Sequence, residues 1–106
     1  FKEIIFVAGA NYYPQDLEEI LEREAGIELG KAVVTAARAA AGDADEILVF
    51  VLHRDEVAAL VPVAERIRRA LGEAASLEVA HVLPVRSIPK TTSGKVQRGR
   101  LAADYE

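Results

Sequence analysis

The sequence contains no cysteine, so disulfide bonds and thiolate metal sites are excluded. Its two histidines, His53 and His81, are far apart and flanked by strand-like residues, so we expect no metal site. No run of about 18 or more apolar residues is present, and we therefore expect no membrane span. The first residues, Phe1 to Ile5, begin an apolar strand pattern and lack the form of a signal peptide. Together these absences agree with a cytoplasmic protein, which is our expectation.

Aromatic residues are also scarce, at 6%, and the net charge is −4, so we expect no nucleic-acid partner. The charge is unevenly distributed, because the segment from 86 to 100 holds five basic residues and no acidic one. These residues are Arg86, Lys90, Lys95, Arg98 and Arg100. Two interpretations remain open for this basic segment: a solvated face of the protein, or a positive patch that attracts an anionic ligand.

The composition predicts a globular chain, since 51% of its 106 residues are apolar and 28% are charged. A chain of this length is expected to form one domain, residues 1–106. A short strand is predicted over Ile4–Val7, followed by a turn at Gly9. Further strands are predicted over Lys31–Ala39, Glu46–His53 and Glu78–Val85. A short turn at 41–45 indicates that the first two of these three strands form an antiparallel pair.

Three helices are predicted between and after these strands. The first begins at Pro14 and stops at Gly26. A proline inside a helix costs about 3 kcal/mol or more, so the second helix is predicted to begin only at Pro62 and to end near Gly72. The last helix is predicted over Val96–Asp104, after a loop over 86–94. The predicted fold class is therefore α+β: a small mixed sheet of about three main strands plus an N-terminal β-turn or hairpin, flanked by helices.

The most informative segment reads Pro89-Lys90-Thr91-Thr92-Ser93-Gly94-Lys95-Val96-Gln97-Arg98. It places a lysine just after a Ser-Gly loop, at the predicted start of the last helix. A phosphate-binding P-loop needs a glycine where this chain has Pro89 and a Ser or Thr where it has Val96, so that motif is excluded. Arg98 lies one helical turn from Lys95, and it either shares the positive patch or pairs with a nearby acid.

Other candidate side chains give weaker signals. The sequence suggests no Ser/His/Asp or Cys/His set for nucleophilic catalysis. Three acids of the first helix follow helical spacing on a polar face, and we expect them to be solvated rather than catalytic: Glu18, Glu19 and Glu22. Tyr12 and Tyr13 form either a small surface aromatic site or part of the packing.

Two segments of the chain together resemble a known family. The segment over 89–98 resembles the last core motif of the acyl-adenylate-forming enzymes, which include acyl-CoA synthetases, fatty acyl-AMP ligases, adenylation domains of nonribosomal peptide synthetases, and luciferases. The stretch from Phe1 to Glu18 is similar to another core motif of the same enzymes. Its version Asn11-Tyr12-Tyr13-Pro14 is most similar to fatty acyl-AMP ligases and to loading domains of polyketide and peptide assembly lines. The resemblance covers the whole chain.

The resemblance implies that residues 1–106 are the small, mobile C-terminal lid domain of an ATP-dependent ligase. A larger N-terminal domain would then bind ATP, Mg²⁺ and the acyl group, and the isolated chain would be inactive. Lys95 matches the family's catalytic lysine, with four neighbours that contact substrate or ATP: Thr92, Ser93, Gly94 and Arg98. Lys2 matches the hinge between the two domains.

The resemblance also implies two reaction steps. A carboxylate and ATP give acyl-AMP and pyrophosphate, and the acyl group then passes to the thiol of coenzyme A or of the phosphopantetheine on an acyl carrier protein. Gly9, Ala10 and Asn11 match a turn that enters the active site in the second step. The family's usual basic residue after this glycine is Ala10 here, so contacts of the turn to phosphopantetheine stay open. The alternative hypothesis is a non-catalytic module that binds a carrier protein or a nucleotide.

Overall fold

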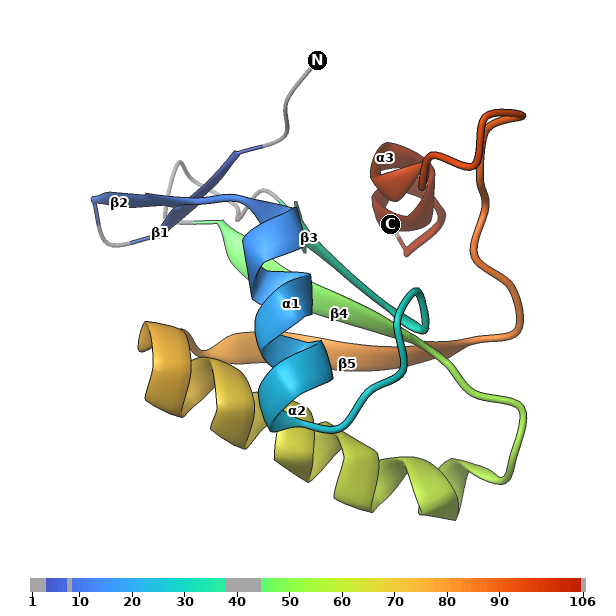
Figure 1. The fold of residues 1–106 in the computed structure, drawn as a ribbon, viewed down its shortest axis with the longest axis horizontal. Coiled ribbons are helices and arrows are strands. Elements are labelled where there is room, and N and C mark those ends of the chain that lie inside the picture. Colours follow the sequence, from blue (N-terminus) through green and yellow to red (C-terminus); the bar gives the residue numbers. More distant parts are fainter. Residues whose placement is uncertain (1–3, 8, 38–44, 106) are drawn as a thin grey trace.

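The computed structural model describes residues 4–7, 9–37 and 45–105 of the chain, with side chains described up to residue 101. A short hairpin of two strands precedes the first helix (Figure 1). Three further strands form a sheet, and the second helix connects the last two of them. In chain order the elements are β1 (Ile5–Val7), β2 (Ala10–Tyr12), α1 (Pro14–Glu24), β3 (Ala32–Ala37), β4 (Glu46–Leu52), the 3₁₀ turn η2 (Val57–Ala59), α2 (Leu60–Ala75), β5 (Val79–Val85) and α3 (Arg98–Tyr105).

The three-stranded sheet has the order β3-β4-β5, with β4 in the centre. Strands β3 and β4 are antiparallel, whereas β4 and β5 are parallel and are joined by α2, because a parallel pair needs a long crossover. Strands β1 and β2 form a separate antiparallel hairpin. The α+β class, the mixed sheet of three strands and the N-terminal hairpin predicted from the sequence are therefore confirmed.

Side chains alternate between the two faces of the sheet, and each face has its own hydrophobic core. Helices α1 and α2 cover one face, where Leu21, Val49 and Ile67 are buried (Figure 1). Helix α3 covers the other face, where Leu101 packs with Phe50. Because β4 contributes to both cores, its nearly continuous apolar sequence is explained by its central position.

The predicted start of the second helix is wrong, whereas its end lies near Gly72 as predicted. Helix α2 begins at Leu60, so Pro62 is its third residue. The first four N–H groups of a helix have no partner within it, and a proline there removes no hydrogen bond. The helix also continues through Gly72 to Ala75 and ends at Ser76, which adopts the left-handed conformation with φ 56°. The helix is long enough for its packed apolar face to outweigh the weak propensity of one glycine.

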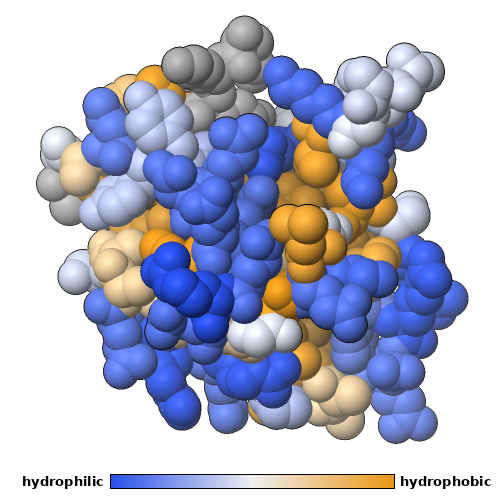
Figure 2. Space-filling view, viewed as in Figure 1, coloured by the Kyte–Doolittle hydropathy of each residue, from blue (hydrophilic) through white to orange (hydrophobic). Residues whose placement is uncertain are grey.

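The surface carries scattered large hydrophobic side chains among polar ones (Figure 2). Leu29 is 83% exposed and Val57 74% exposed, and Phe6 protrudes from the first hairpin. None of the helices in the described part of the chain is long and apolar enough to cross a membrane.

Candidate functional site

The segment around Lys95 forms a small β-hairpin. Lys90 and Val96 make an antiparallel bridge. The backbone N–H of Thr91 donates to the Lys95 carbonyl oxygen at 2.8 Å, and that of Gln97 donates to the Pro89 carbonyl oxygen at 2.9 Å. The predicted last helix is present as α3, but it begins at Arg98, two residues after the predicted start. Lys95 therefore lies on the second arm of a hairpin rather than at the start of a helix.

The tip of this hairpin consists of Thr92, Ser93 and Gly94. The Gly94 N–H donates to the Thr91 carbonyl oxygen at 2.9 Å, which closes a four-residue turn. Gly94 itself has φ +88°, a conformation that glycine adopts without steric cost, as in three-residue hairpin loops. The glycine before Lys95 is thus required by the backbone of the tip.

The Thr91 side chain holds the two arms of the hairpin together. Its hydroxyl oxygen accepts a hydrogen bond from the Lys95 backbone N–H at 3.1 Å and lies 3.0 Å from the Ser93 hydroxyl oxygen. The Ser93 hydroxyl is therefore occupied within the turn, several residues before helix α3, and does not cap that helix. Because its side chain accepts the Lys95 amide across the turn, Thr91 contributes directly to the geometry of the loop.

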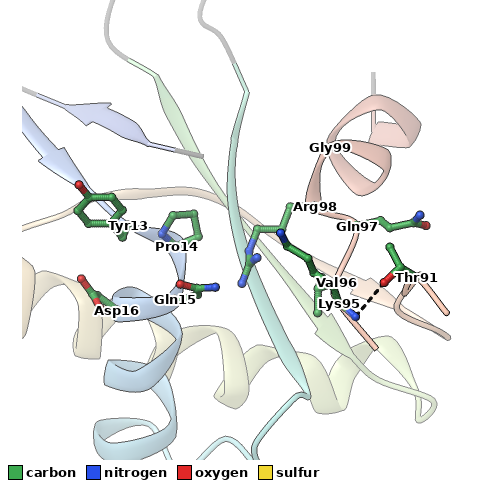
Figure 3. Close-up of a pocket in the computed structure, with 10 residues that line it drawn as sticks. All are labelled: Tyr13, Pro14, Gln15, Asp16, Thr91, Lys95, Val96, Gln97, Arg98 and Gly99. Carbon is green, nitrogen blue, oxygen red and sulfur yellow. Dashed lines mark hydrogen bonds between the residues drawn. The ribbon is translucent and has the colours of Figure 1, made fainter. Parts of the chain in front are cut away.

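A groove of about 820 Å³ separates this hairpin from the start of helix α1. Figure 3 shows its two walls facing each other, with the C-terminal segment opposite the first turn of α1. The Lys95 side chain is exposed at the groove, which also contains apolar surface from Tyr13 and Val96. Residues of the groove are Tyr13, Pro14, Gln15, Asp16, Thr91, Lys95, Val96, Gln97, Arg98 and Gly99. The groove offers one solvent-accessible ammonium group beside an apolar wall.

Arg98, the first residue of α3, pairs with Glu18 of α1. Its Nη2 donates to Glu18 Oε1 at 2.5 Å and its Nε donates to Glu18 Oε2 at 3.1 Å. Both side chains are mostly buried, at 11% and 15% exposed. Glu18 Oε2 also accepts the Val34 backbone N–H at 2.9 Å. The expectation that Glu18 is solvated is therefore wrong, and Arg98 adopts the second of its two predicted roles, pairing with an acid.

Burial raises the pKa of the Glu18 carboxyl above its ordinary value of 4.5, because the charged form loses hydration. The Arg98 guanidinium and the Val34 N–H stabilise the carboxylate and oppose this rise, whereas the neighbouring Glu22 adds to it. The loss of hydration is the largest contribution, so the net direction is upward.

The other predicted site residues lie elsewhere. Gly9, with φ +79°, and the exposed Ala10 and Asn11 belong to the first hairpin. Figure 1 shows that hairpin on the opposite side of the molecule from the loop that carries Lys95. The predicted hinge residue Lys2 lies outside the described residues. The structure thus groups Lys95 with its neighbours in sequence but does not bring the turn at Gly9 to them.

The two tyrosines have different environments. Tyr12 is half-buried, and its hydroxyl donates to the Ala75 carbonyl oxygen at 3.4 Å, so it belongs to the packing. Tyr13 is 44% exposed and lines the groove. The described residues contain no group of three His, Asp or Glu side chains that could hold a metal ion. The exposed Lys95 ammonium group suits a phosphate or a carboxylate.

The sequence did not predict the hydrogen bonds of Thr91 in the turn or the buried pairing of Glu18 with Arg98. The turn had a signal, because four small or turn-forming residues ending in glycine are typical of a hairpin tip. Glu18 had none, since its partner Arg98 is 80 residues away.

Comparison with known proteins is consistent with the two motifs. No protein-family profile matches the chain. The 4-hydroxyphenylalkanoate adenylyltransferase of Mycobacterium tuberculosis is 34% identical over 98% of this chain. A long-chain-fatty-acid–AMP ligase of Mycobacterium marinum is 32% identical over the same share. The chain spans only 17% and 18% of the lengths of these two relatives.

Solved structures share the fold. A multidomain structure with the adenylation domain of a keto acid-selecting nonribosomal peptide synthetase module superimposes with a TM-score of 0.85 at 28% identity. The match covers 98% of this chain and 9% of that protein. The similarity thus extends over 98% of this chain and over a small part of each larger protein.

Proposed function

We propose that this chain, a domain of the acyl-adenylate-forming enzymes, is the C-terminal lid of an acyl-AMP ligase and supplies its catalytic lysine, Lys95. The single observation that carries this proposal is the position of Lys95. It is an exposed cation just after the tip of an ordered hairpin, within the segment that resembles the family's last core motif. Relatives named as adenylyltransferases and acyl-AMP ligases support the reaction class.

The chemistry of adenylation requires such a cation. A carboxylate attacks the α-phosphate of ATP and pyrophosphate leaves, so two anions approach while negative charge grows on the phosphoryl oxygens. A preorganised ammonium group between the acyl oxygen and the phosphate stabilises that charge in the transition state. Lysine suits this role because it carries a compact charge on a long side chain.

The placement of Lys95 on a lid allows it to act in one step only. The hairpin of Lys95 and the turn at Gly9 lie on opposite sides of this domain (Figure 1). Rotation of the domain can therefore present Lys95 to the active site for adenylation and the Gly9–Asn11 turn for thiol transfer. This arrangement supports a two-step reaction in which the edge with Lys95 faces the active site in the first step and the edge with the Gly9–Asn11 turn faces it in the second.

The proposal also includes partners that the chain lacks. A larger N-terminal domain holds ATP, Mg²⁺ and the acyl group, and the acceptor is coenzyme A or the phosphopantetheine of an acyl carrier protein. The chain spans about a sixth of its relatives' length, and the groove at Lys95 is open on one side, so we expect the chain to be inactive alone. We propose the cytoplasm as its location.

The test uses the full-length ligase that contains this domain. Lys95→Ala is expected to slow acyl-AMP formation by about 10²- to 10³-fold, measured as ATP–pyrophosphate exchange. Lys90→Ala is the matched control, because Lys90 is an exposed lysine of the same hairpin. A wild-type exchange rate in Lys95→Ala would overturn the assignment, and exchange by the purified 106-residue chain would overturn the expectation that it is inactive alone.

A further inference from the structure

We propose that Glu18 is a positioning residue for Lys95 and that it acts through Arg98. The inference rests on the proposed function, because it assigns a role in the same reaction to a side chain that does not reach the groove. Glu18 lies on α1, Lys95 on the C-terminal hairpin, and the two are connected by the Glu18–Arg98 ion pair.

The Glu18 carboxylate connects three separate elements. One oxygen, Oε1, accepts from Arg98 Nη2 at the start of α3. The other, Oε2, accepts from Arg98 Nε and from the Val34 N–H of the edge strand β3. Two parallel hydrogen bonds to a planar guanidinium fix its orientation as well as its distance. The start of α3 is therefore held in a defined direction against both α1 and β3.

This anchor is adjacent to the catalytic hairpin. Arg98 follows Gln97, whose N–H donates to the Pro89 carbonyl oxygen at the base of the hairpin. The bridge between Lys90 and Val96 joins the two arms above this base, so a movement of the base also moves the tip. Lys95 lies only three residues before Arg98, so a rotation at the start of α3 would displace its ammonium group.

Apolar packing alone does not provide the same control. Leu101 holds α3 on the sheet, but apolar contacts have little directionality and allow a helix to roll or shift. Compared with a well-packed apolar pair, a buried ion pair adds little net stability, because the loss of hydration offsets the attraction, whereas removal of one partner leaves a buried charge and is destabilising. Its two hydrogen bonds do specify one geometry. This combination of small stability and high specificity is what a positioning residue requires.

The experiment compares two variants in the full-length ligase, Glu18→Gln and Glu18→Ala. Glutamine keeps an acceptor for the Val34 N–H, whereas alanine removes all three hydrogen bonds. A displacement of a reacting group by about 1 Å can cost on the order of 10²-fold in rate, so Glu18→Ala is expected to lower the kcat of acyl-AMP formation by about 10- to 100-fold. Glu18→Gln is expected to fall between Glu18→Ala and the wild type. The KM for ATP should stay close to the wild-type value, because Glu18 contacts no substrate.

Separate measurement of the two half-reactions distinguishes positioning from a loss of folding. Thiol transfer from a supplied acyl-adenylate does not use Lys95 in the proposed mechanism, so Glu18→Ala should leave its rate unchanged. A merely structural role would slow both half-reactions. Ile67→Val provides a destabilised control, since Ile67 lies in the core under α1 and α2 and not in the core that holds Leu101 of α3. Glu24→Gln is the matched acid control, since Glu24 forms an exposed pair with Arg23 on the same helix.

The outcomes separate this inference from the proposed function. If Lys95→Ala slows adenylation but Glu18→Ala does not, the positioning role is wrong and the proposed function stands. If Lys95→Ala itself has no effect, the proposed function fails first. If Glu18→Ala slows adenylation and thiol transfer equally, as Ile67→Val would through lost folded protein, the role of Glu18 is structural and the inference is overturned.

Discussion

The Thr91 hydroxyl oxygen accepts a hydrogen bond from the backbone N–H of Lys95 at 3.1 Å. This contact crosses the hairpin tip and joins the residue before the turn to the residue that carries the candidate catalytic ammonium group. A hydroxyl accepts a hydrogen bond and a methyl group does not, so this bond depends on the Thr91 hydroxyl and not on the volume of the side chain.

Thr91→Val should therefore loosen the tip while it preserves the volume of the side chain. We expect the Lys95 amide to exchange faster with solvent and the free energy of unfolding to fall by about 0.5–1.5 kcal/mol, the net contribution of one hydrogen bond. Thr91→Ser keeps the hydroxyl and is the matched control. Amide hydrogen exchange and urea unfolding of the 106-residue chain measure the two quantities. Equal exchange rates at Lys95 in both variants would contradict this role.

Gly94 and Gly72 should respond to alanine in opposite directions. Gly94 has φ +88°, and its Cβ position meets no atom within 4 Å, so Gly94→Ala adds backbone strain alone. A left-handed conformation costs an L-residue about 1–2 kcal/mol, which is the expected loss of stability. Gly72 lies inside α2 and a Cβ there would meet only the Leu77 carbonyl oxygen at 3.9 Å. Gly72→Ala should thus stabilise by about 0.5–1 kcal/mol.

Thermal unfolding of the two variants tests the pair. The melting temperature is expected to fall for Gly94→Ala and to rise for Gly72→Ala. A rise in both would show that the hairpin tip adapts without strain.

The raised pKa of Glu18 predicts a specific dependence of stability on pH. The folded state holds the Glu18 proton more tightly than the unfolded state, because burial penalises the carboxylate. The stabilisation from this group is therefore fully present below its ordinary pKa of 4.5 and is lost as pH rises through the higher folded-state value. Glu18→Gln removes the titration and isolates the contribution.

The measurement is the free energy of unfolding of both proteins across the acidic range. The difference, wild type minus Glu18→Gln, should decrease as pH rises above 4.5 and then become constant. A difference that increases with pH would mean that the attraction to Arg98 exceeds the cost of burial.

Leu101 should anchor α3 and, with it, the hairpin. It is 5% exposed and packs with Val33, Leu48 and Phe50 on the second face of the sheet. Leu101→Ala is expected to cost about 2–5 kcal/mol, as for other buried leucines. Leu29→Ala is the control, because Leu29 is 83% exposed and its loss should change stability by less than about 0.5 kcal/mol. Urea unfolding compares the two, and similar losses would mean that α3 does not pack on the sheet in solution.

Much of the fold was predictable because its signals are local. The apolar run of β4 and the buried stripe with Ile67 and Leu71 depend on residues close in sequence. The sequence prediction places the start of α2 too late, because the sequence does not show that Pro62 falls in the first turn. A proline in the first turn of a helix removes no hydrogen bond. The hairpin at Lys95 was predicted as a loop, since its arms are too short to show alternation.

The sequence by itself determined the kinds of elements, the central position of β4 and the segment that holds Lys95, because short-range periodicity and turn-forming residues encode them. The tertiary structure decided that Glu18 meets Arg98 and that Thr91 and Gly94 shape a hairpin in front of a groove. The sequence of a helix does not distinguish a solvent-exposed acid from a buried acid that is paired with a cation. Which one Glu18 becomes depends on α3, whose first residue, Arg98, comes 80 residues later in the chain.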